Sequence, residues 1–375
     1  MKSKTKKFFK ISMPILGISA ITASVVCLSG VLIKVSTISI GGSTAVLPLI
    51  NSFANYFTDI DIVTSAGGSG IGVNSIIEGT KEIGMASKNP EILPLGEDDP
   101  KYRAWKEKQV KTLTIAWDGI GILYKPTEKS KNDDLIINKE TLAKIYHLFS
   151  GYKEFTFNDL LGNFDDTKLI PFARNGGAAV SGTTDGFLND SHINYNESLY
   201  WQSLNNDTQS QIINSIEKGG YGSYVLETAE ANSQAWNRVK NSSEGSIIYL
   251  SSGFILNNLD EIQKHGFKIA KYEIVDEVTN EIVYGDLTQD SITKTYNWYR
   301  PFNLIYSIDQ IKNNNEIKEL LKRILFWNES RQIIINEGYV PLTNGQLESM
   351  GWDNNQEFFI DENTSDINLG YSGAK

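Results

Sequence analysis

Three short clusters of glycine, serine and threonine are the residues of this chain best suited to binding chemistry. They read GGST (41–44), SAGGSG (65–70) and RNGGAAVSGTT (174–184). Glycine permits the bends that turn successive backbone N–H groups toward one point, and serine and threonine hydroxyls add donors without charge. The arginine adds a planar fork that holds an oxyanion bidentately. The pattern therefore predicts a site for a small anion.

The same clusters carry no nucleotide, metal or catalytic signature. The chain has no G-x-x-x-x-G-K-[ST], and SAGGSGIG misses the G-x-G-x-x-G spacing. His147, His192 and His265 lack the spacing of zinc ligands, so neither a metal nor a cofactor is expected. There is no G-x-S-x-G elbow, and no histidine shares a motif with Ser69 or Ser181. An enzyme is not expected, although a serine-type hydrolase remains the alternative from another class.

Local patterns place each cluster where a strand meets a helix. A strand over 37–40 precedes the first cluster and a helix over 46–57 follows it, with the helix N-terminus at Ser43 and Thr44. A strand over 60–64 and a helix over 73–78 repeat this arrangement at the second cluster. Further strands are predicted at 83–87, 113–124, 168–173, 245–249 and 303–307, and further helices at 142–149 and 316–338. This alternation indicates an α/β fold with a mainly parallel sheet, in which ligands bind beyond the carboxyl ends of strands.

The first 34 residues indicate export and anchoring. Five lysines precede an uncharged stretch over 11–33, which is long enough as a helix to cross a bilayer. Cys27, the only cysteine of the chain, lies late in this stretch and is a candidate lipidation site. The alternative is an uncleaved signal anchor with an unmodified Cys27. Both readings place the rest of the chain on the outer face of the plasma membrane.

The charge balance narrows the class of partner. The chain carries a formal net charge of −10, and its first 34 residues hold six lysines and no acid. The exported part is therefore more acidic than the whole, and a nucleic-acid partner is not expected. An anionic ligand remains compatible, because helix N-termini and local donors can hold it. We expect a monomer.

The order of motifs resembles the solute-binding lipoproteins of phosphate ABC importers of the Pst type, which are two-lobed periplasmic-type binding proteins. The matching segments are GGSTAVLP, GGSGIGVNSIIEGTKEIGMASKNP, AWDGIGILYKP, LAKIYHLFSG, ARNGGAAVSGTTDGF, EGSIIYL and FWNESRQIIINEGYVPL. The resemblance implies a two-lobed periplasmic-binding-protein-like α/β fold of two three-layer domains, with hinge crossings near Lys125 and Phe302. The expected divisions are the signal peptide or anchor (1–34), lobe 1 (35–124), lobe 2 (125–301), the return of lobe 1 (302–352) and a loose tail (353–375).

The resemblance also implies a function and a site. The protein would capture inorganic phosphate between its lobes and deliver it to the permease subunits of an ABC importer. The first lobe would contribute Ser43, Thr44, Ala45, Ser69 and Gly70. The second lobe would contribute Arg174, Ser181, Gly182 and Thr183. Other tetrahedral oxyanions (sulfate, molybdate, tungstate) are the alternative ligands, and an adhesin on the same fold is a further possibility.

Two features depart from the family pattern. The family's arginine is usually followed closely by S-G-T, whereas here residues 175–180 separate Arg174 from Ser181. Well-characterised members also carry an aspartate after the A-S dipeptide, which accepts the proton of hydrogen phosphate, and here Lys88 occupies that position. We expect Asp118, in the AWDG segment, to replace this acceptor and to pair with Lys88.

Overall fold

The computed structural model describes residues 25–28, 31–34, 37–90, 99–189, 192–275, 279 and 281–349. No helix within these ranges is long and apolar enough to span a membrane. Residues 1–24 of the predicted anchor and the predicted tail (353–375) lie outside the described residues. Strands β1 (Val25–Leu28), which contains Cys27, and β2 (Val31–Lys34) pair antiparallel where the sequence favoured a helix. The β-branched valines of this segment favour an extended backbone.

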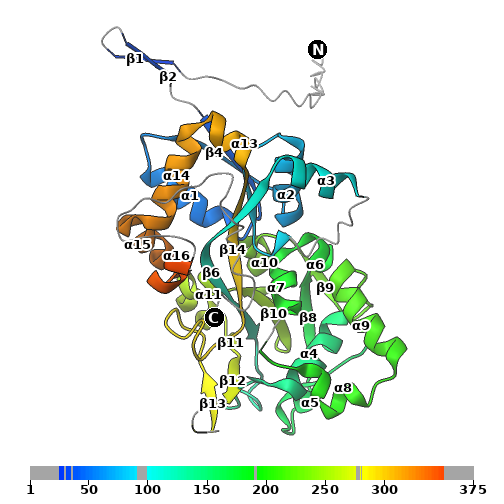
Figure 1. Ribbon diagram of the computed structural model, residues 1–375. Coiled ribbons are helices and arrows are strands. Elements are labelled where there is room, and N and C mark those ends of the chain that lie inside the picture. Colours follow the sequence, from blue (N-terminus) through cyan, green and yellow to red (C-terminus); the bar gives the residue numbers. More distant parts are fainter. Residues whose placement is uncertain are drawn as a thin grey trace, which may run out of the picture.

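Lobe 1 is a layer of parallel strands between two layers of helices (Figure 1). Its strands are β3 (Thr37–Gly42), β4 (Asp61–Ala66) and β5 (Ile83–Ala86). One face is covered by α1 (Leu47–Tyr56), α14 (Asn315–Phe326) and α15 (Asn328–Asn336), whose apolar side chains share one core. The other face is covered by α2 (Ser69–Glu78) and α3 (Pro100–Glu107) around a smaller core. Both glycine-rich turns of this lobe therefore lie at the same ends of adjacent strands.

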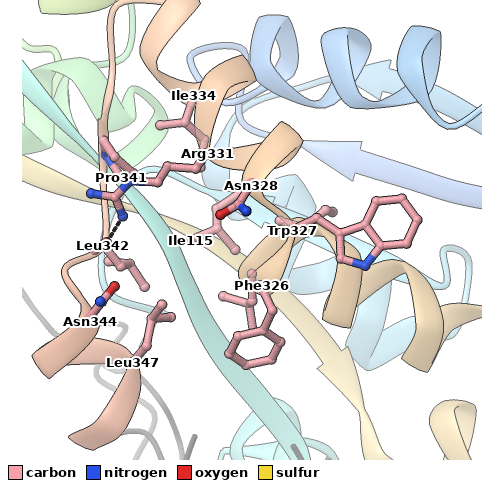
Figure 2. A pocket seen from close by; sticks show the side chains of 12 residues that line it. Ile115, Phe326, Trp327, Asn328, Arg331, Ile334, Pro341, Leu342, Asn344 and Leu347 are labelled. Atoms are coloured by element: carbon pink, nitrogen blue, oxygen red, sulfur yellow. Dashed lines mark hydrogen bonds between the residues drawn. The ribbon is translucent and has the colours of Figure 1, made fainter. Parts of the chain in front are cut away.

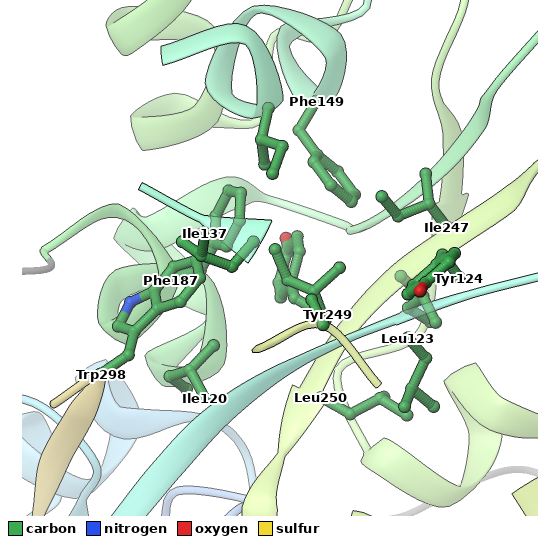
Figure 3. Packing of buried hydrophobic residues seen from close by; sticks show 14 of the residues in the cluster. Ile120, Leu123, Tyr124, Ile137, Phe149, Phe187, Ile247, Tyr249, Leu250 and Trp298 are labelled. Atoms are coloured by element: carbon green, nitrogen blue, oxygen red, sulfur yellow. The ribbon is translucent and has the colours of Figure 1, made fainter. Parts of the chain in front are cut away.

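Lobe 2 contains the third cluster and the larger core. Its parallel strands are β8 (Ile170–Arg174), β9 (Leu226–Thr228) and β10 (Ser246–Ser251). Its helices are α4 (Lys139–Ser150), α5 (Phe157–Leu161), α6 (Gly177–Val180), α7 (Gly182–Leu188), α8 (Leu199–Gln202), α9 (Asn206–Lys218), α10 (Asn232–Val239), α11 (Ser252–Asn257) and α12 (Leu259–Lys264). Phe187 of α7 stacks on Tyr249 of β10 with ring centroids 4.2 Å apart, beside Trp298 (Figure 3). This aromatic packing fixes α7 and the turn that precedes it.

Two long strands join the lobes. They are β6 (Val110–Tyr124) and β14 (Tyr299–Ser307), which pair antiparallel. Along β6, Ala116 belongs to the lobe 1 core and Trp117 to the lobe 2 core, and along β14 the same change falls between Tyr299 and Phe302. The chain thus passes between cores in the middle of β6, earlier than Lys125. Which residues act as hinges stays a prediction.

The main sheet is mixed, which corrects the expectation of a mainly parallel one. Its order is β4-β3-β5-β14-β6-β10-β8-β9. The strand pairs on either side (β4–β3, β3–β5, β10–β8 and β8–β9) are parallel, whereas the two central strands β14 and β6 run antiparallel to each of their neighbours in this order. The short strands β11 (Lys268–Ile269) and β15 (Val340–Pro341) also pair antiparallel with β6. Antiparallel pairing follows because β6 and β14 carry the chain between lobes in opposite directions.

Most predicted elements are confirmed, and one helix is divided. The strands predicted at 37–40, 60–64, 83–87, 113–124, 168–173, 245–249 and 303–307 are all present. The helix predicted over 316–338 consists of α14 and α15, because Trp327 takes an extended backbone between them (ψ 136°). The remaining elements are the short 3-10 helix η2 (Tyr195–Glu197), α13 (Ile308–Asn313), α16 (Asn344–Ser349) and a three-stranded sheet of β7 (Ile136–Ile137), β12 (Lys271–Val275) and β13 (Ile282–Gly285).

Candidate functional site

Three buried serines of lobe 1 meet at the ends of its strands. Ser43 follows β3, Ser69 begins α2, and Ser87 follows β5. The Ser43 hydroxyl donates to Ser87 Oγ (2.9 Å), and Ser69 Oγ lies 3.3 Å from the same atom. The Ser87 backbone N–H donates to Ser69 Oγ (3.0 Å). The structure therefore brings the two glycine-rich turns of lobe 1 together, and adds Ser87, which the sequence prediction did not include.

The first turn differs from its prediction in one respect. Helix α1 begins at Leu47 with Val46 as its N-cap, so neither Ser43 nor Thr44 caps it. Ser43 Oγ accepts instead from the Ala45 backbone N–H at 3.3 Å. Pro48 favours a helix that starts at Leu47, because proline is accommodated in the first turn of a helix. Gly70 lies in the first turn of α2 with open space where a Cβ would project.

The turn before α7 brings lobe 2 against these serines. Ser181 caps α7 and accepts from the Thr184 backbone N–H at 3.1 Å. A Cβ on the next residue, Gly182, would lie 1.9 Å from Ser87 Oγ and 2.8 Å from Ser69 Oγ. Only glycine permits this approach. The two lobes are thus in contact at the residues predicted to bind a ligand.

The longer loop between Arg174 and Ser181 does not carry them apart. Residues 177–180 form the single turn α6, and the Ser181 backbone N–H donates to Gly177 O at 2.8 Å. Arg174 and the Ser181 hydroxyl both lie close enough to the Glu230 carboxyl group to lower its pKa. The departure from the family spacing is therefore absorbed by a helical turn.

Arg174 is fully buried, and its side chain hydrogen-bonds only to neutral groups. Its Nη1 donates to Ala229 O (3.1 Å) and its Nη2 to Asn232 Oδ1 (2.7 Å), while Nε has no hydrogen-bond partner. Burial lowers the pKa of the Arg174 guanidinium, and the nearby Glu230 acts in the opposite direction. A buried cation with an unused donor is suited to receive an anion.

Glu230 is a site residue that the sequence reasoning missed. It lies in the loop between β9 and α10, and its Oε1 accepts from Thr44 Oγ1 of lobe 1 at 3.2 Å. Burial raises the pKa of Glu230, against the opposing effects of Arg174, Ser181 and Arg300. Its Oε2 is buried without a hydrogen-bond partner. No spacing signal distinguishes this glutamate in the sequence.

Asp118 does not pair with Lys88, which corrects that prediction. Asp118 Oδ2 accepts from Arg300 Nε (3.0 Å) and Nη2 (2.8 Å). Its Oδ1 accepts from the hydroxyls of Ser251 (2.7 Å) and Ser252 (3.0 Å). Asp118 and Arg300 lie opposite each other on adjacent strands, so the sheet register itself creates the pair. Because a carboxylate has about four acceptor positions, this environment occupies Asp118 fully.

Arg300 is the second residue that the prediction missed. It is fully buried, and its Nη1 donates to Ser87 Oγ of lobe 1 at 3.4 Å. Its Nη2 donates to Thr183 Oγ1 of lobe 2 at 3.2 Å. A signal was available, because Arg300 is the one charged residue in the apolar strand β14. We call Ser43, Ser69, Ser87, Arg174, Ser181, Thr183, Glu230 and Arg300 the cleft cluster.

Lys88 and Asp185 lie at the edge of the cleft cluster. Lys88 Nζ donates to Ala178 O at 3.1 Å, across the two lobes. Burial raises the pKa of Asp185 to about 6, although Lys88 and Arg300 act to lower it. Asp185 Oδ2 is buried without a hydrogen-bond partner. Both residues are therefore close enough to influence charge at the cluster.

Two further features do not compete with the cleft cluster. A cavity of about 250 Å³ is lined by α14, α15 and α16 together with Ile115 (Figure 2). Most of its lining residues are apolar in type, and its one cation, Arg331, donates to Leu342 O at 2.9 Å. Among the residues that the structure describes, no three histidine, cysteine or acidic side chains are grouped as metal ligands.

Comparison with known proteins supports the fold. No protein-family model matches the chain. The uncharacterized lipoprotein MG412 of Mycoplasma genitalium is 33% identical over 374 residues, covering 92% of each protein. An ABC-type phosphate transport receptor from Vibrio cholerae aligns over 81% of this chain and 100% of its own, with 20% identity and a TM-score of 0.51. A phosphate-binding protein from Stenotrophomonas maltophilia covers 84% of this chain and 93% of its own, with 12% identity and a TM-score of 0.55.

These likenesses confirm the predicted two-lobed α/β fold of periplasmic binding proteins.

Proposed function

The chain belongs to the same family as the uncharacterized lipoprotein MG412 of Mycoplasma genitalium, and we propose that it is an extracytoplasmic solute-binding protein for inorganic phosphate. It captures the anion between its two lobes and delivers it to the permease subunits of an ABC importer. The relative is a lipoprotein, which supports attachment through an acylated Cys27 to the outer face of the membrane.

One observation carries the proposal: the cleft cluster gathers two buried guanidinium groups and several hydroxyls from both lobes. Arg174 retains an unused Nε–H, and Arg300 contacts a hydroxyl of each lobe. The hydroxyls of Ser43, Ser69 and Ser87 bond mainly to one another. An oxyanion that entered between them would exchange these neutral contacts for charge-assisted ones, which are roughly twice as strong.

Binding at this cluster requires the lobes to move. Gly182 lies in contact with Ser87 and Ser69, so the lobes are closed on each other. An anion reaches the cluster only when they part, and β6 and β14 are the long strands that join them. Hinge motion of this kind closes binding proteins around their ligands.

Selectivity for hydrogen phosphate is proposed to lie with Glu230. Hydrogen phosphate can donate a proton near pH 7, whereas sulfate cannot. Asp118 is occupied by Arg300 and two serine hydroxyls, so its role is to position Arg300. Glu230 Oε2 is buried without a partner beside Arg174, which makes it the acceptor with a free position. Sulfate has no proton to donate, so it would leave that acceptor unpaired.

Calorimetric titration of the full chain in detergent tests this function. We expect one phosphate bound per chain, and sulfate binding weaker by at least about 100-fold because of the buried acceptor. Glu230→Gln should reduce the preference for phosphate over sulfate. Molybdate or sulfate binding without phosphate binding would instead assign the protein to another tetrahedral oxyanion.

A further inference from the structure

A second cavity adjoins the cleft cluster. It has a volume of about 390 Å³ and lies where α1 of lobe 1 faces α10 and α11 of lobe 2. Thr44 and Asn232 line it, and each also bonds to the cluster. Thr44 Oγ1 donates to Glu230, and Asn232 Oδ1 accepts from Arg174 Nη2. The cavity and the cleft cluster therefore share a wall.

The walls of this cavity are largely apolar, and neutral polar side chains are set among the apolar ones. Its polar side chains are those of Thr44, Asn51, Asn232, Ser233, Asn257 and Asn258. Glu337 is its one charged residue, and no lysine or arginine lines it. Asn51 and Asn232 each accept a hydrogen bond through Oδ1, at 2.7 Å in both cases, which leaves their amide N–H groups for a further partner. Such groups recognise hydroxyls well, and they offer nothing to neutralise a second anion.

The size of the cavity fits a small organic group. One water occupies about 30 Å³ in the liquid, and ligand pockets begin at about 300 Å³. A volume of about 390 Å³ is more than inorganic phosphate needs, and it lies outside the cleft cluster. Because the walls come from both lobes, a group held here would also favour the closed arrangement.

We propose that the protein also binds phosphate monoesters of small polyols. The phosphoryl group occupies the cleft cluster, and the hydroxylated carbon chain extends past Thr44 and Asn232 into the cavity. This inference rests on the proposed function, since it assigns the phosphoryl group to the same site. It excludes diphosphates, whose second phosphoryl group would meet only neutral amides and Glu337.

Titration of the full chain in detergent with inorganic phosphate, glycerol 3-phosphate and pyrophosphate tests the proposal. We expect glycerol 3-phosphate to bind within about tenfold of inorganic phosphate, and pyrophosphate to bind at least about 100-fold more weakly, given the uncompensated charge. Phosphate binding with glycerol 3-phosphate weaker by about 100-fold or more would overturn this inference alone. Failure of both phosphate and glycerol 3-phosphate would overturn the proposed function with it.

A cavity-filling variant locates the organic group. Asn257→Trp should weaken glycerol 3-phosphate by about 30-fold or more through steric exclusion, and change inorganic phosphate by less than about threefold. Asn214→Trp, at an exposed asparagine of α9, is the matched control and should change neither. Ser233→Leu is a second filling variant, and circular dichroism checks the fold of each. Unchanged glycerol 3-phosphate affinity in both folded variants would overturn the proposal.

Discussion

Two buried arginines of the cleft cluster differ in their hydrogen-bond partners. Arg300 forms two hydrogen bonds with the Asp118 carboxylate and contacts Ser87 and Thr183. Arg174 donates to a backbone carbonyl and an amide oxygen, and keeps one N–H without a partner. Both side chains are fully buried. Arg300 is thus a compensated charge that holds the lobes' hydroxyls in place, whereas Arg174 has a charge and a donor to offer a ligand.

The difference follows from where each arginine lies in the fold. Arg300 is opposite Asp118 on adjacent strands, and that register supplies its counter-ion. Arg174 ends β8 at the carboxyl edge of the sheet, where its guanidinium hydrogen-bonds to Ala229 in the loop after β9 and to Asn232 at the start of α10. A charge in the middle of a strand must be neutralised for folding, while a charge at a strand end can be left for a ligand.

Removing the counter-ion of Arg300 should have the largest effect. Asp118→Ala leaves a buried guanidinium without compensation, and we expect the free energy of unfolding to fall by about 3–5 kcal/mol. Urea unfolding at pH 7 without ligand measures this. The double variant Asp118→Leu with Arg300→Met removes both charges and should lose less. A loss below about 1 kcal/mol in Asp118→Ala would contradict the assigned role of the pair.

Arg174→Met should act mainly on binding. It removes a buried charge-assisted contact, and we expect phosphate affinity to fall by about 30- to 1000-fold, equivalent to about 2–4 kcal/mol. Its cost in stability should be smaller than that of Asp118→Ala, because Arg174 hydrogen-bonds to neutral groups and not to a carboxylate. Calorimetric titration and urea unfolding of the same variant measure the two effects. Unchanged affinity would place Arg174 outside the ligand site.

Asp185 is a buried acid beside the same cluster that has no cationic partner at Oδ2. Arg300 and Lys88 lower the pKa of its carboxyl group, but neither forms a hydrogen bond with Asp185 Oδ2. Burial dominates and raises the pKa of Asp185 to about 6 in the folded protein. Between about pH 4 and pH 6 the folded state keeps a proton that the unfolded state has lost, so stability falls as pH rises through this range and is level above it. Asp185→Asn removes this loss and should stabilise the protein at pH 7 by up to about 3 kcal/mol.

The measurement for Asp185 is the free energy of unfolding of wild type and Asp185→Asn at pH 4, 5, 6 and 7. The difference between them should grow from pH 4 to pH 6 and then stay constant. Parallel profiles over this range would show that Asp185 does not titrate in this way.

Thr44→Val should have the smallest effect. It removes one neutral hydroxyl while keeping the shape of the side chain, and we expect phosphate binding to weaken by about 1–2 kcal/mol. Thr37→Val, at the other end of β3, is the matched control and should leave affinity unchanged, because its hydroxyl donates to Asp61. Equal affinities for Thr44→Val and Thr37→Val would remove Thr44 from the proposed site.

The sequence by itself determined the local parts of the site. Glycine and serine at strand ends predicted the turns around Ser43, Ser69 and Ser181, and in the structure each of the three serines lies at or just before the start of a helix. These features depend on backbone preferences of a few neighbouring residues, such as the left-handed Gly79 that ends α2. Motif order also identified the fold, because each motif is local and their sequence along the chain is fixed.

Only the tertiary structure decided how charges are shared at the site. Arg300, Glu230 and Asp118 lie on a late strand, a loop and an early strand, and no spacing in the sequence links them. The Asp118–Arg300 pair spans 182 residues, and the Thr44–Glu230 contact spans 186. Such contacts arise from strand register and lobe closure, which depend on packing across the whole molecule. The sequence could therefore show which residues offer donors, while packing alone decided which charge is compensated and which is left for a ligand.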